Sequence, residues 1–275
     1  MKKYIVLFSF VIIFIAVAVI GIILSKNNNK YDLKIHFFDA GKADAILISY
    51  NDKIMLIDTG EDDLADDISS YLKNGGHNKI DYMIITHFDK DHVGSASKLI
   101  DEFDIGYVFQ SNYPKESVYY SNYLNSLNSK NIVPETVVDD KEIVINDLSI
   151  RINGPKIIYE KNESNNSSLI TSLTYKNNSF LFMGDAQNAR IKNFIEEDNN
   201  TYDFLKVPYH GRYLKRLDDL LENRNIKYAV ITSSSEEVED DKTIDSLEKY
   251  NIRYYLTRNG EIDVLSDGKN INIKQ

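Results

Sequence analysis

Two histidines and two aspartates lie within six consecutive positions of this chain. They are His87, Asp89, Asp91 and His92. An apolar run over 80–85 precedes them and a helical pattern begins at 96, so they sit on a turn between a predicted strand and a predicted helix, where ligands and catalytic groups are often displayed. Imidazole nitrogens together with carboxylate oxygens suit zinc, manganese or iron. In the alternative interpretation an aspartate merely caps the helix and the histidines lie on the surface. Further aspartates and histidines later in the chain, which could belong to the same site, argue against that alternative.

The first 30 residues differ in character from the rest of the chain. Residues 4–24 form an uncharged apolar run, long enough for a helix of about 30 Å that would span the core of a bilayer. The run ends in Ile22-Ile23-Leu24 instead of a small-x-small cleavage site, so we expect an uncleaved anchor. Lysines flank it almost evenly, and a short tail before one span usually leaves a large domain outside. We predict a cytoplasmic tail, a single transmembrane helix and a polar linker in 1–30, with the domain 31–275 on the outer side of the cell membrane.

The composition limits the chemistry and the partners. The chain has no cysteine, which excludes disulfides, thiolate chemistry and a lipidated cysteine anchor. Its 42 acidic residues outnumber its 32 basic residues, and the formal net charge is −10. This charge argues against broad nonspecific binding to nucleic acid, so a phosphate-bearing substrate would need local positive charge. Residues 31–275 are long enough for one large core.

Strand and helix patterns come in two blocks. The first block has predicted strands at 33–38, 45–50, 53–57, 80–85 and 105–109, and predicted helices at 62–73, 96–103 and 119–129. The second block has a predicted meander at 135–152, a polar loop at 161–168, a hairpin of 169–175 with 180–183, strands at 204–207, 228–232, 254–256, 261–265 and 271–273, and helices at 186–197, 215–223 and 242–250. Two strand-rich halves with helices between them predict an α/β fold with two packed sheets flanked by helices.

Six segments, in this order along the chain, resemble the motifs of the metallo-β-lactamase superfamily. They read DAGKADA (39–45), IDTG (57–60), THFDKDHVG (86–94), NNSSL (165–169), FMGDA (182–186) and KVPYHG (206–211). More narrowly, they resemble the hydrolase-like domain of ComEC-type competence proteins and their stand-alone relatives, in which Asp89 stands where the lactamases have a second histidine. The resemblance implies an αββα sandwich with a metal site at one edge, between the sheets.

The resemblance also implies one or two divalent metal ions, zinc or manganese, and their ligands. The implied ligands are His87 and Asp89 for one ion, Asp91, His92 and His210 for the other, and Asp185 as the bridge. A carboxylate that bridges two ions holds them close, so that a shared hydroxide can form near neutral pH. Asp58 would accept a hydrogen bond from a ligating histidine and fix its tautomer, and Asp44 is the weaker candidate for such a role. Asp58 could otherwise be an ordinary turn residue before Gly60.

The chain departs from the family pattern at several positions. Lactamases have a further histidine before the bridging aspartate, where this chain has Asn165 or Asn166, so we do not expect β-lactam hydrolysis. A histidine that usually follows the strand at 228–232 is missing from 233–238, which would alter or abolish activity if that histidine contacts phosphate. Tyr209 replaces a common histidine, and it would either donate a proton to a leaving oxygen or only pack.

Basic residues gather around His210 in an otherwise acidic chain. They are Lys206, Arg212, Lys215 and Arg216. Beside a metal ion such cations would bind phosphate and stabilise a phosphoryl transition state, although Lys215 and Arg216 would equally suit the exposed face of a helix. Together with aspartate ligands, this pattern favours a phosphodiester substrate. The predicted catalytic residues are Asp91, His210, Arg212 and Lys206.

Three functions remain open at this point. The first is a membrane-anchored, metal-dependent phosphodiesterase, such as a nuclease that acts on DNA at the cell surface. The second is a hydrolase of another ester or thioester of the cell envelope. The third is a non-catalytic metal-binding or scaffold domain, which the missing histidine near Ser235 would favour. The sequence lacks the many membrane spans of a ComEC-type channel, so a role in DNA uptake would need a partner membrane channel protein.

Overall fold

The computed structural model describes residues 31–275 apart from 162 and 223, and these residues form two sheets. The first sheet has the strand order β15-β14-β1-β2-β3-β4-β5-β6. Its strands are β1 (Leu33–Phe37), β2 (Ala45–Tyr50), β3 (Lys53–Thr59), β4 (Lys79–Ile85), β5 (Asp104–Gln110), β6 (Glu135–Thr136), β14 (Ile262–Ser266) and β15 (Ile271–Lys274). The second sheet has the order β13-β12-β11-β10-β9-β8-β7. Its strands are β7 (Lys141–Ile145), β8 (Leu148–Asn153), β9 (Ile170–Tyr175), β10 (Asn178–Phe182), β11 (Phe204–Lys206), β12 (Tyr228–Ile231) and β13 (Arg253–Leu256).

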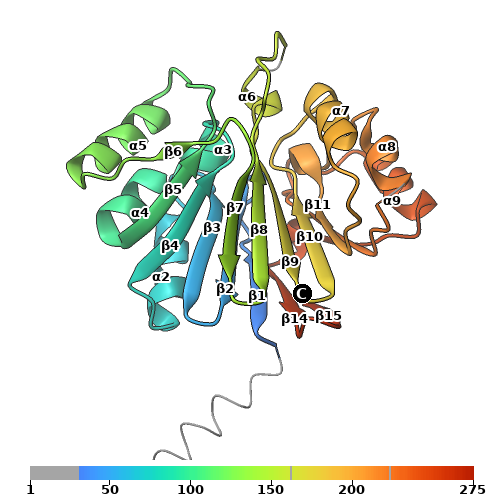
Figure 1. Cartoon of the computed structure of the whole chain (residues 1–275), viewed down its shortest axis with the longest axis horizontal. Coiled ribbons are helices and arrows are strands. Elements are labelled where there is room, and N and C mark those ends of the chain that lie inside the picture. Colours follow the sequence, from blue (N-terminus) through green and yellow to red (C-terminus); the bar gives the residue numbers. More distant parts are fainter. Residues whose placement is uncertain (1–30, 162, 223) are drawn as a thin grey trace, which may run out of the picture.

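The two sheets pack face to face, and helices cover the outer face of each (Figure 1). The strand β2 shows how the sequence builds these layers, because Ile46 and Ile48 belong to the core between the sheets while Ala45 and Leu47 pack toward the helices. Successive side chains of a strand point to opposite faces, and both faces are covered here, so the strand is almost wholly apolar. The covering helices are α2 (Ala65–Asn74), α4 (Ala96–Glu102) and α5 (Val118–Ser129) on the first sheet, and α7 (Asn188–Glu197), α8 (Leu217–Glu222) and α9 (Asp241–Lys249) on the second. The layers therefore follow the predicted order of helix, sheet, sheet and helix.

The connections that carry the predicted site residues lie at one edge of the sandwich. The strands β3, β4 and β5 run parallel to one another, and so do β10, β11 and β12. The carboxyl ends of parallel strands meet at the same edge of a sheet, which is where ligands bind in α/β sheets. The short elements there are α3 (Lys90–Val93) after β4 and the 3-10 helix η1 (Pro208–Gly211) after β11. A second 3-10 helix, η2 (Thr257–Asn259), follows β13.

Two predictions about the strands and loops are wrong. The segment 135–152 is not a meander, because β6 pairs in parallel with β5 in the first sheet while β7 and β8 form a hairpin in the second. The buried Val137 donates its N–H to the carbonyl of Gln110 and fills the core between the sheets, so the chain crosses from one sheet to the other just after β6. The predicted polar loop at 161–168 contains a helical turn, α6 (Glu163–Asn166).

The predicted tail, membrane anchor and linker in 1–30 lie outside the residues that the structure describes. Within 31–275, leaving aside 162 and 223, there is no helix that is both long and apolar enough to cross a membrane. The anchor therefore stays a prediction from the apolar run at 4–24.

Candidate metal centre

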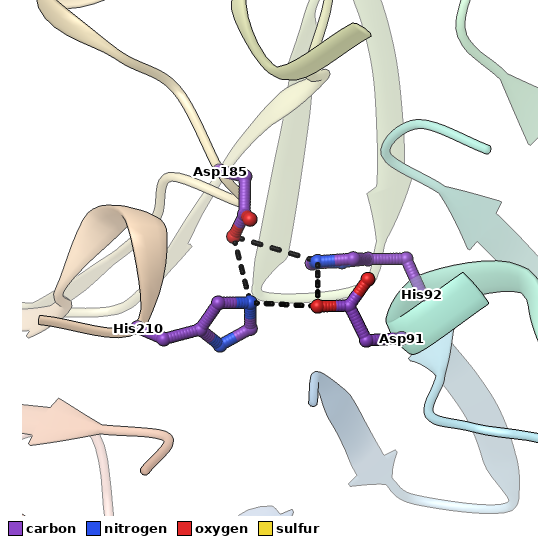
Figure 2. A group of neighbouring side chains, drawn as sticks. All are labelled: Asp91, His92, Asp185 and His210. Carbon is purple, nitrogen blue, oxygen red and sulfur yellow. Dashed lines mark ion pairs between the residues drawn. The ribbon is translucent and has the colours of Figure 1, made fainter. Parts of the chain in front are cut away.

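Four side chains converge between the two sheets at the edge described above (Figure 2). They are Asp91 and His92 from α3, Asp185 from the turn after β10, and His210 from η1. The Oδ1 atom of Asp185 lies 3.4 Å from Nε2 of His92 and 3.2 Å from Nε2 of His210. The Oδ2 atom of Asp91 lies 3.4 Å from Nε2 of His210 and 4.0 Å from Nε2 of His92. Two nitrogens and two carboxylate oxygens thus face one small space, three of them from buried side chains.

Uncommon backbone conformations place these side chains. Gly184, directly before Asp185, has a φ of +51°, and a Cβ there would lie only 3.1 Å from the nearest side chain. Glycine avoids both the strain and the close approach. Tyr209 and His210 have φ values of 54° and 52°, and Asp58 has 55°. Left-handed residues other than glycine are uncommon and cluster at functional sites, so the local backbone marks this edge as a site in its own right.

The carboxylate of Asp58, the second-last residue of β3, orients His92 and His87. Its Oδ2 atom accepts a hydrogen bond from Nδ1 of His92 at 2.8 Å and another from the hydroxyl of Thr86 at 2.6 Å. Because a carboxylate only accepts, the proton of His92 is on Nδ1 and the lone pair of Nε2 faces the cluster. The hydroxyl hydrogen of Thr86 is used by Asp58, so the Thr86 oxygen accepts from Nδ1 of His87, 3.1 Å away. His87 therefore also presents an Nε2 lone pair.

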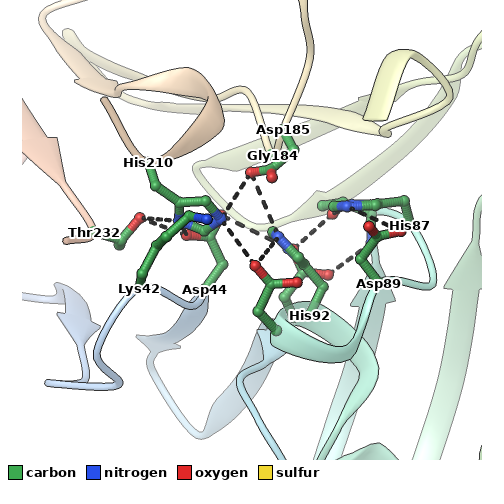
Figure 3. A network of polar contacts seen from close by, with 12 residues as sticks. Lys42, Asp44, His87, Asp89, His92, Gly184, Asp185, His210 and Thr232 are labelled. Carbon is green, nitrogen blue, oxygen red and sulfur yellow. Dashed lines mark hydrogen bonds and ion pairs between the residues drawn. The ribbon is translucent and has the colours of Figure 1, made fainter. Parts of the chain in front are cut away.

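The carboxylate of Asp44, at the start of β2, orients His210 through Thr232 (Figure 3). The hydroxyl of Thr232 donates to Oδ1 of Asp44 at 2.7 Å and lies 3.0 Å from Nδ1 of His210, from which it accepts. The other oxygen of Asp44 pairs with the ammonium of Lys206, which also donates to the carbonyl of Gly184 at 3.1 Å. Lys206 and Asp44 are both buried, and each compensates the charge of the other. Two buried carboxylates thus fix the tautomers of three histidines.

The residues of the cluster fit a divalent metal ion. Among the described residues, Nε2 of His92, Nε2 of His210 and Oδ1 of Asp185 are buried and have no hydrogen-bond partner. Buried polar atoms are nearly always paired, so three that converge without a partner indicate a ligand. Together with Asp91 they form a nitrogen and oxygen donor set that suits zinc, manganese or iron. The nearby carboxylate of Asp58 is already occupied by its own hydrogen bonds, so it orients ligands instead of binding the ion itself.

The charges around the cluster shift the pKa values of its members in opposite directions. Burial alone lowers the pKa of His210, but Asp185 and Asp44 outweigh burial and raise this pKa to about 9. Burial alone raises the pKa of Asp185, but His210 and His92 outweigh it and hold this pKa well below its usual range. Burial and the neighbouring His92 lower the pKa of His87 to about 4. The pKa of His92 is also raised well above its usual range, because Asp185 and Asp58 outweigh burial. In the metal-free protein His210 and His92 therefore each keep a proton that an entering ion must displace, whereas His87 is neutral.

Asp89, one of the implied ligands, is bound by Lys115 and Ser164. Its Oδ1 atom lies 2.6 Å from Nζ of Lys115 and also accepts the hydroxyl of Ser164. Nε2 of His87 lies 3.8 Å from the same oxygen. In the part of the chain that the structure describes, neither His87 nor Asp89 belongs to a group of three His, Asp or Glu residues with ligand atoms within 4.8 Å of one another. The structure thus brings together four of the six implied ligands in one group and leaves these two apart from it.

The prediction that Lys206 belongs to a phosphate-binding basic patch around His210 is wrong. This lysine is fully buried on β11 and pairs with Asp44 behind the cluster, so it is not open to a phosphate group. Arg212 and Arg216 lie nearer the surface, and each pairs with an aspartate, at 3.4 Å and 2.6 Å. Lys206 therefore acts on the site by holding Asp44, and the sequence pattern of four neighbouring cations does not produce four cations facing the ion site.

No role at the site was predicted from the sequence for four residues that shape it. They are Thr86, Thr232, Lys115 and Ser164. Thr86 and Thr232 each directly follow a strand that leads to the site, so their position at a strand end was a usable signal. Lys115 comes from the connection between β5 and α5, and Ser164 from α6. No spacing in the sequence links either residue to Asp89.

The fold and this site define the class of protein. Residues 39–233 match the family model described as the metallo-beta-lactamase superfamily, and the chain belongs to this superfamily. Members of the fold are typically metal-dependent hydrolases, which agrees with the cluster of histidine and aspartate ligands. The chain is also related to ComE operon protein 3 of Bacillus subtilis (strain 168), with 24% identity over 204 residues. That match covers 70% of this chain and 25% of the relative, so this chain spans about a quarter of the length of the curated relative that it matches.

Solved structures confirm the fold. The metallo-beta-lactamase fold protein YhfI from Bacillus subtilis has a TM-score of 0.57 at 10% identity, over 82% of this chain and 96% of that chain. CmlA, a diiron beta-hydroxylase from Streptomyces venezuelae, has a TM-score of 0.52 at 13% identity, over 82% of this chain and 52% of that chain. Because the same fold serves a hydroxylase, the reaction of this chain must be argued from its own site.

Proposed function

We propose that this protein is a metal-dependent hydrolase of phosphodiesters and that its substrate class is DNA. The observation that carries the proposal is the convergence of three buried, unpartnered ligand atoms with Asp91 at the open end of the cluster. The cluster has two carboxylate oxygens, two imidazole nitrogens and no thiolate, a donor set that suits zinc or manganese, and an ion held there can bind phosphate oxygens. The resemblance to the hydrolase-like domain of ComEC-type competence proteins supports DNA as the substrate.

The residues of the chain prepare this chemistry. When bound, a divalent ion supplies Lewis acidity and makes water near it more acidic. Asp58 and Asp44 keep the Nε2 lone pairs of His92 and His210 directed at the ion, so the site needs little rearrangement when the ion enters. Asp91 is 24% exposed and forms the side of the cluster nearest to solvent, where a substrate would approach.

We also propose that residues 4–24 anchor the protein in the cell membrane as a single span, with the domain on the outer side and a membrane channel protein as a partner. The support is the uncharged apolar run and the large domain that follows a short tail. Fractionation should place the full-length chain in the membrane, and protease added to cells stripped of their wall should cleave the domain. A chain that stays in the soluble fraction would contradict the anchor, and a protected domain would contradict the orientation.

The test of the activity uses the purified full-length chain in mild detergent, loaded with manganese or zinc, and a fluorescent single-stranded DNA. We expect metal-dependent cleavage that a chelator stops, that Asp91→Asn abolishes and that Asp67→Asn retains. Asp67 is a matched control because it is an exposed aspartate on α2. Folded, metal-loaded protein that does not cleave DNA or a simple diester such as bis(p-nitrophenyl) phosphate would exclude the phosphodiesterase.

A second candidate is a hydrolase of another ester or thioester of the cell envelope. One observation favours it, because Lys206, Arg212 and Arg216 are each paired with a carboxylate and do not form the predicted phosphate-binding patch. A panel of phosphodiesters, carboxylic esters and thioesters, with the same Asp91→Asn and Asp67→Asn variants, separates the two candidates. Stoichiometric metal without turnover on any of them would favour the third function, a metal-binding scaffold.

A further inference from the structure

The carboxylate of Asp89 has two strong partners on a single oxygen. Its Oδ1 atom is 2.6 Å from the ammonium of Lys115 and accepts the hydroxyl of Ser164. An oxygen of a carboxylate offers about two lone pairs, so these two donors saturate it. It is also the oxygen that lies 3.8 Å from Nε2 of His87, which makes it the atom that would have to share an ion with that histidine. The Asp89 oxygen that lies 3.8 Å from His87 is therefore already in use.

No other described side chain completes an ion site at this position. Asn166 is one of the two asparagines that stand near the place of the family's histidine, but its amide donates to the carbonyl of Lys161 at 2.9 Å and its oxygen accepts the N–H of Arg190 at 3.2 Å. Both ends of that side chain are thus used, the oxygen at the start of α7 and the amide nitrogen at Lys161. Within the described residues, the donor groups of three or more that lie within 4.8 Å of one another contain neither His87 nor Asp89. With Asp185 assigned to the four-residue group, this position offers two protein ligands, one fewer than a catalytic zinc site has.

Lys115 already supplies a positive charge next to Asp89, where a second ion would lie. The ammonium of Lys115 brings one positive charge to Asp89, and a divalent ion in the same place would be repelled by it at a distance of a few ångströms. The side chain of Lys115 is 36% exposed and lines a hollow of about 600 Å³ together with Tyr113, Tyr120 and Ser164. The lysine thus reaches Asp89 from a hollow that is open to solvent.

We propose that Lys115 takes the place of a second metal ion. The chain then binds one divalent ion, through Asp91, His92, Asp185 and His210, and the ammonium of Lys115 is the fixed positive charge beside it. Nε2 of His87, which is buried and has no hydrogen-bond partner among the described residues, would then accept a hydrogen bond from water or substrate beside the ion instead of binding a second ion. This inference departs from the pair of ions that the resemblance allows. It rests on the metal centre of the proposed function but not on the identity of the substrate.

The test counts the bound ions. The full-length chain in mild detergent is saturated with Mn²⁺, freed of unbound metal and measured by inductively coupled plasma mass spectrometry, and its electron paramagnetic resonance spectrum is recorded. We expect one ion per chain and the spectrum of an isolated Mn²⁺ centre. Lys115→Met frees Asp89 and should raise the count toward two, with an exchange-coupled spectrum, whereas Lys115→Arg should keep one ion.

Lys98→Met is the matched control, because Lys98 is an exposed lysine of α4 whose ammonium donates to the carbonyl of Asp62 and which pairs with none of the cluster residues in the described part of the chain. It should leave the count at one. Two ions in the unaltered chain would overturn the inference while the metal centre stands. One ion in both the unaltered chain and Lys115→Met would show that Lys115 does not exclude the second ion. No ion in folded protein would overturn the metal centre and the proposed function together.

Discussion

Asp89 and Asp91 stand two residues apart on the same turn, yet their carboxylates have opposite surroundings. Asp91 faces two histidines whose Nε2 atoms have no hydrogen-bond partner among the described residues. Asp89 faces a lysine and a serine that already bind its oxygen. The motif places both carboxylates at the edge of the sheets, but the partners that decide what each one binds come from distant connections. The chemical role of a motif residue is therefore set by residues outside the motif.

The same contrast holds for the two lysines that pair with aspartates at the site. Lys206 is buried completely and holds Asp44 behind His210, whereas Lys115 is 36% exposed and holds Asp89 in front of His87. One pair is part of the scaffold that positions a ligand, and the other occupies a place at which an ion could have been bound.

The largest expected effect separates the two lysines by stability. Lys206→Met leaves the buried Asp44 without its countercharge, so we expect a loss of about 3–5 kcal/mol in the free energy of unfolding. Lys115→Met removes a partly exposed pair and should cost no more than about 1 kcal/mol. Urea unfolding followed by circular dichroism measures both. The double variant Lys206→Met/Asp44→Asn should regain part of the loss, and equal losses in the two single variants would contradict the comparison.

The next effect separates the two aspartates by metal affinity. Asp91→Asn removes a ligand and should weaken binding of Mn²⁺ or Zn²⁺ by more than about 100-fold, beyond what the loss of an orienting partner costs. Asp89→Asn should change the affinity by less than about threefold, because its oxygen is used by Lys115 and Ser164. Competition with a chromophoric chelator measures both affinities. Comparable losses in the two variants would show that Asp89 is a ligand after all.

A smaller effect is expected from the relay to His210. Thr232→Val removes the hydroxyl that links His210 to Asp44 and should lower the metal affinity by about 10–100-fold. Thr171→Val is the matched control, because Thr171 is buried on β9 and its hydroxyl has no hydrogen-bond partner among the described residues. That control should leave the affinity unchanged. The same chelator competition serves, and a loss that is equal in both variants would mean that the hydroxyl does not orient His210.

The smallest effect concerns pH and separates His210 from His87. The pKa of His210 is raised to about 9, so its protonated form stabilises the metal-free fold fully below about pH 6.5, and this contribution is lost as the pH rises through about 9. An ion must displace this proton and that of His92, whose pKa is also raised, so the apparent metal affinity should rise with pH by at least about tenfold per unit over the same range. The pKa of His87 is lowered to about 4, so it adds no slope there. His210→Gln should reduce the slope of the affinity profile measured from pH 6.5 to 9 to the part that His92 contributes, and His87→Gln should leave the slope unchanged. The reverse result would exchange the roles of the two histidines.

The sequence predicted most of this fold because its signals are local. Apolar runs such as Ala45–Tyr50 and the turn at Asn51-Asp52 mark strands and hairpins without knowledge of the partner. The grouping of Asp91, His92, Asp185 and His210 also followed from residues at strand ends, read together with the family resemblance. Such positions come together because parallel strands end at one edge of a sheet.

What the sequence did not predict depends on three-dimensional partners. By residue type alone, Lys206 on β11 cannot be told from a surface lysine. It is buried because it pairs with Asp44, which lies 162 positions earlier in the sequence. The contacts of Asp89 with Lys115 and Ser164 likewise join three separate connections. The sequence also did not predict that β6 belongs to the first sheet, because a strand of two residues has no pattern of its own.

The position of β1 has a consequence for the order in which the chain can fold. The strand Leu33–Phe37 lies between β2 and β14, and β14 begins only at Ile262. One edge of β1 therefore stays open while the intervening residues emerge from the ribosome, and an open apolar edge is a surface on which chains aggregate. Completion of the first sheet has to wait for the last strands to be synthesised. Truncation before residue 262 should therefore reduce the yield of folded protein far more than the few strands removed would suggest.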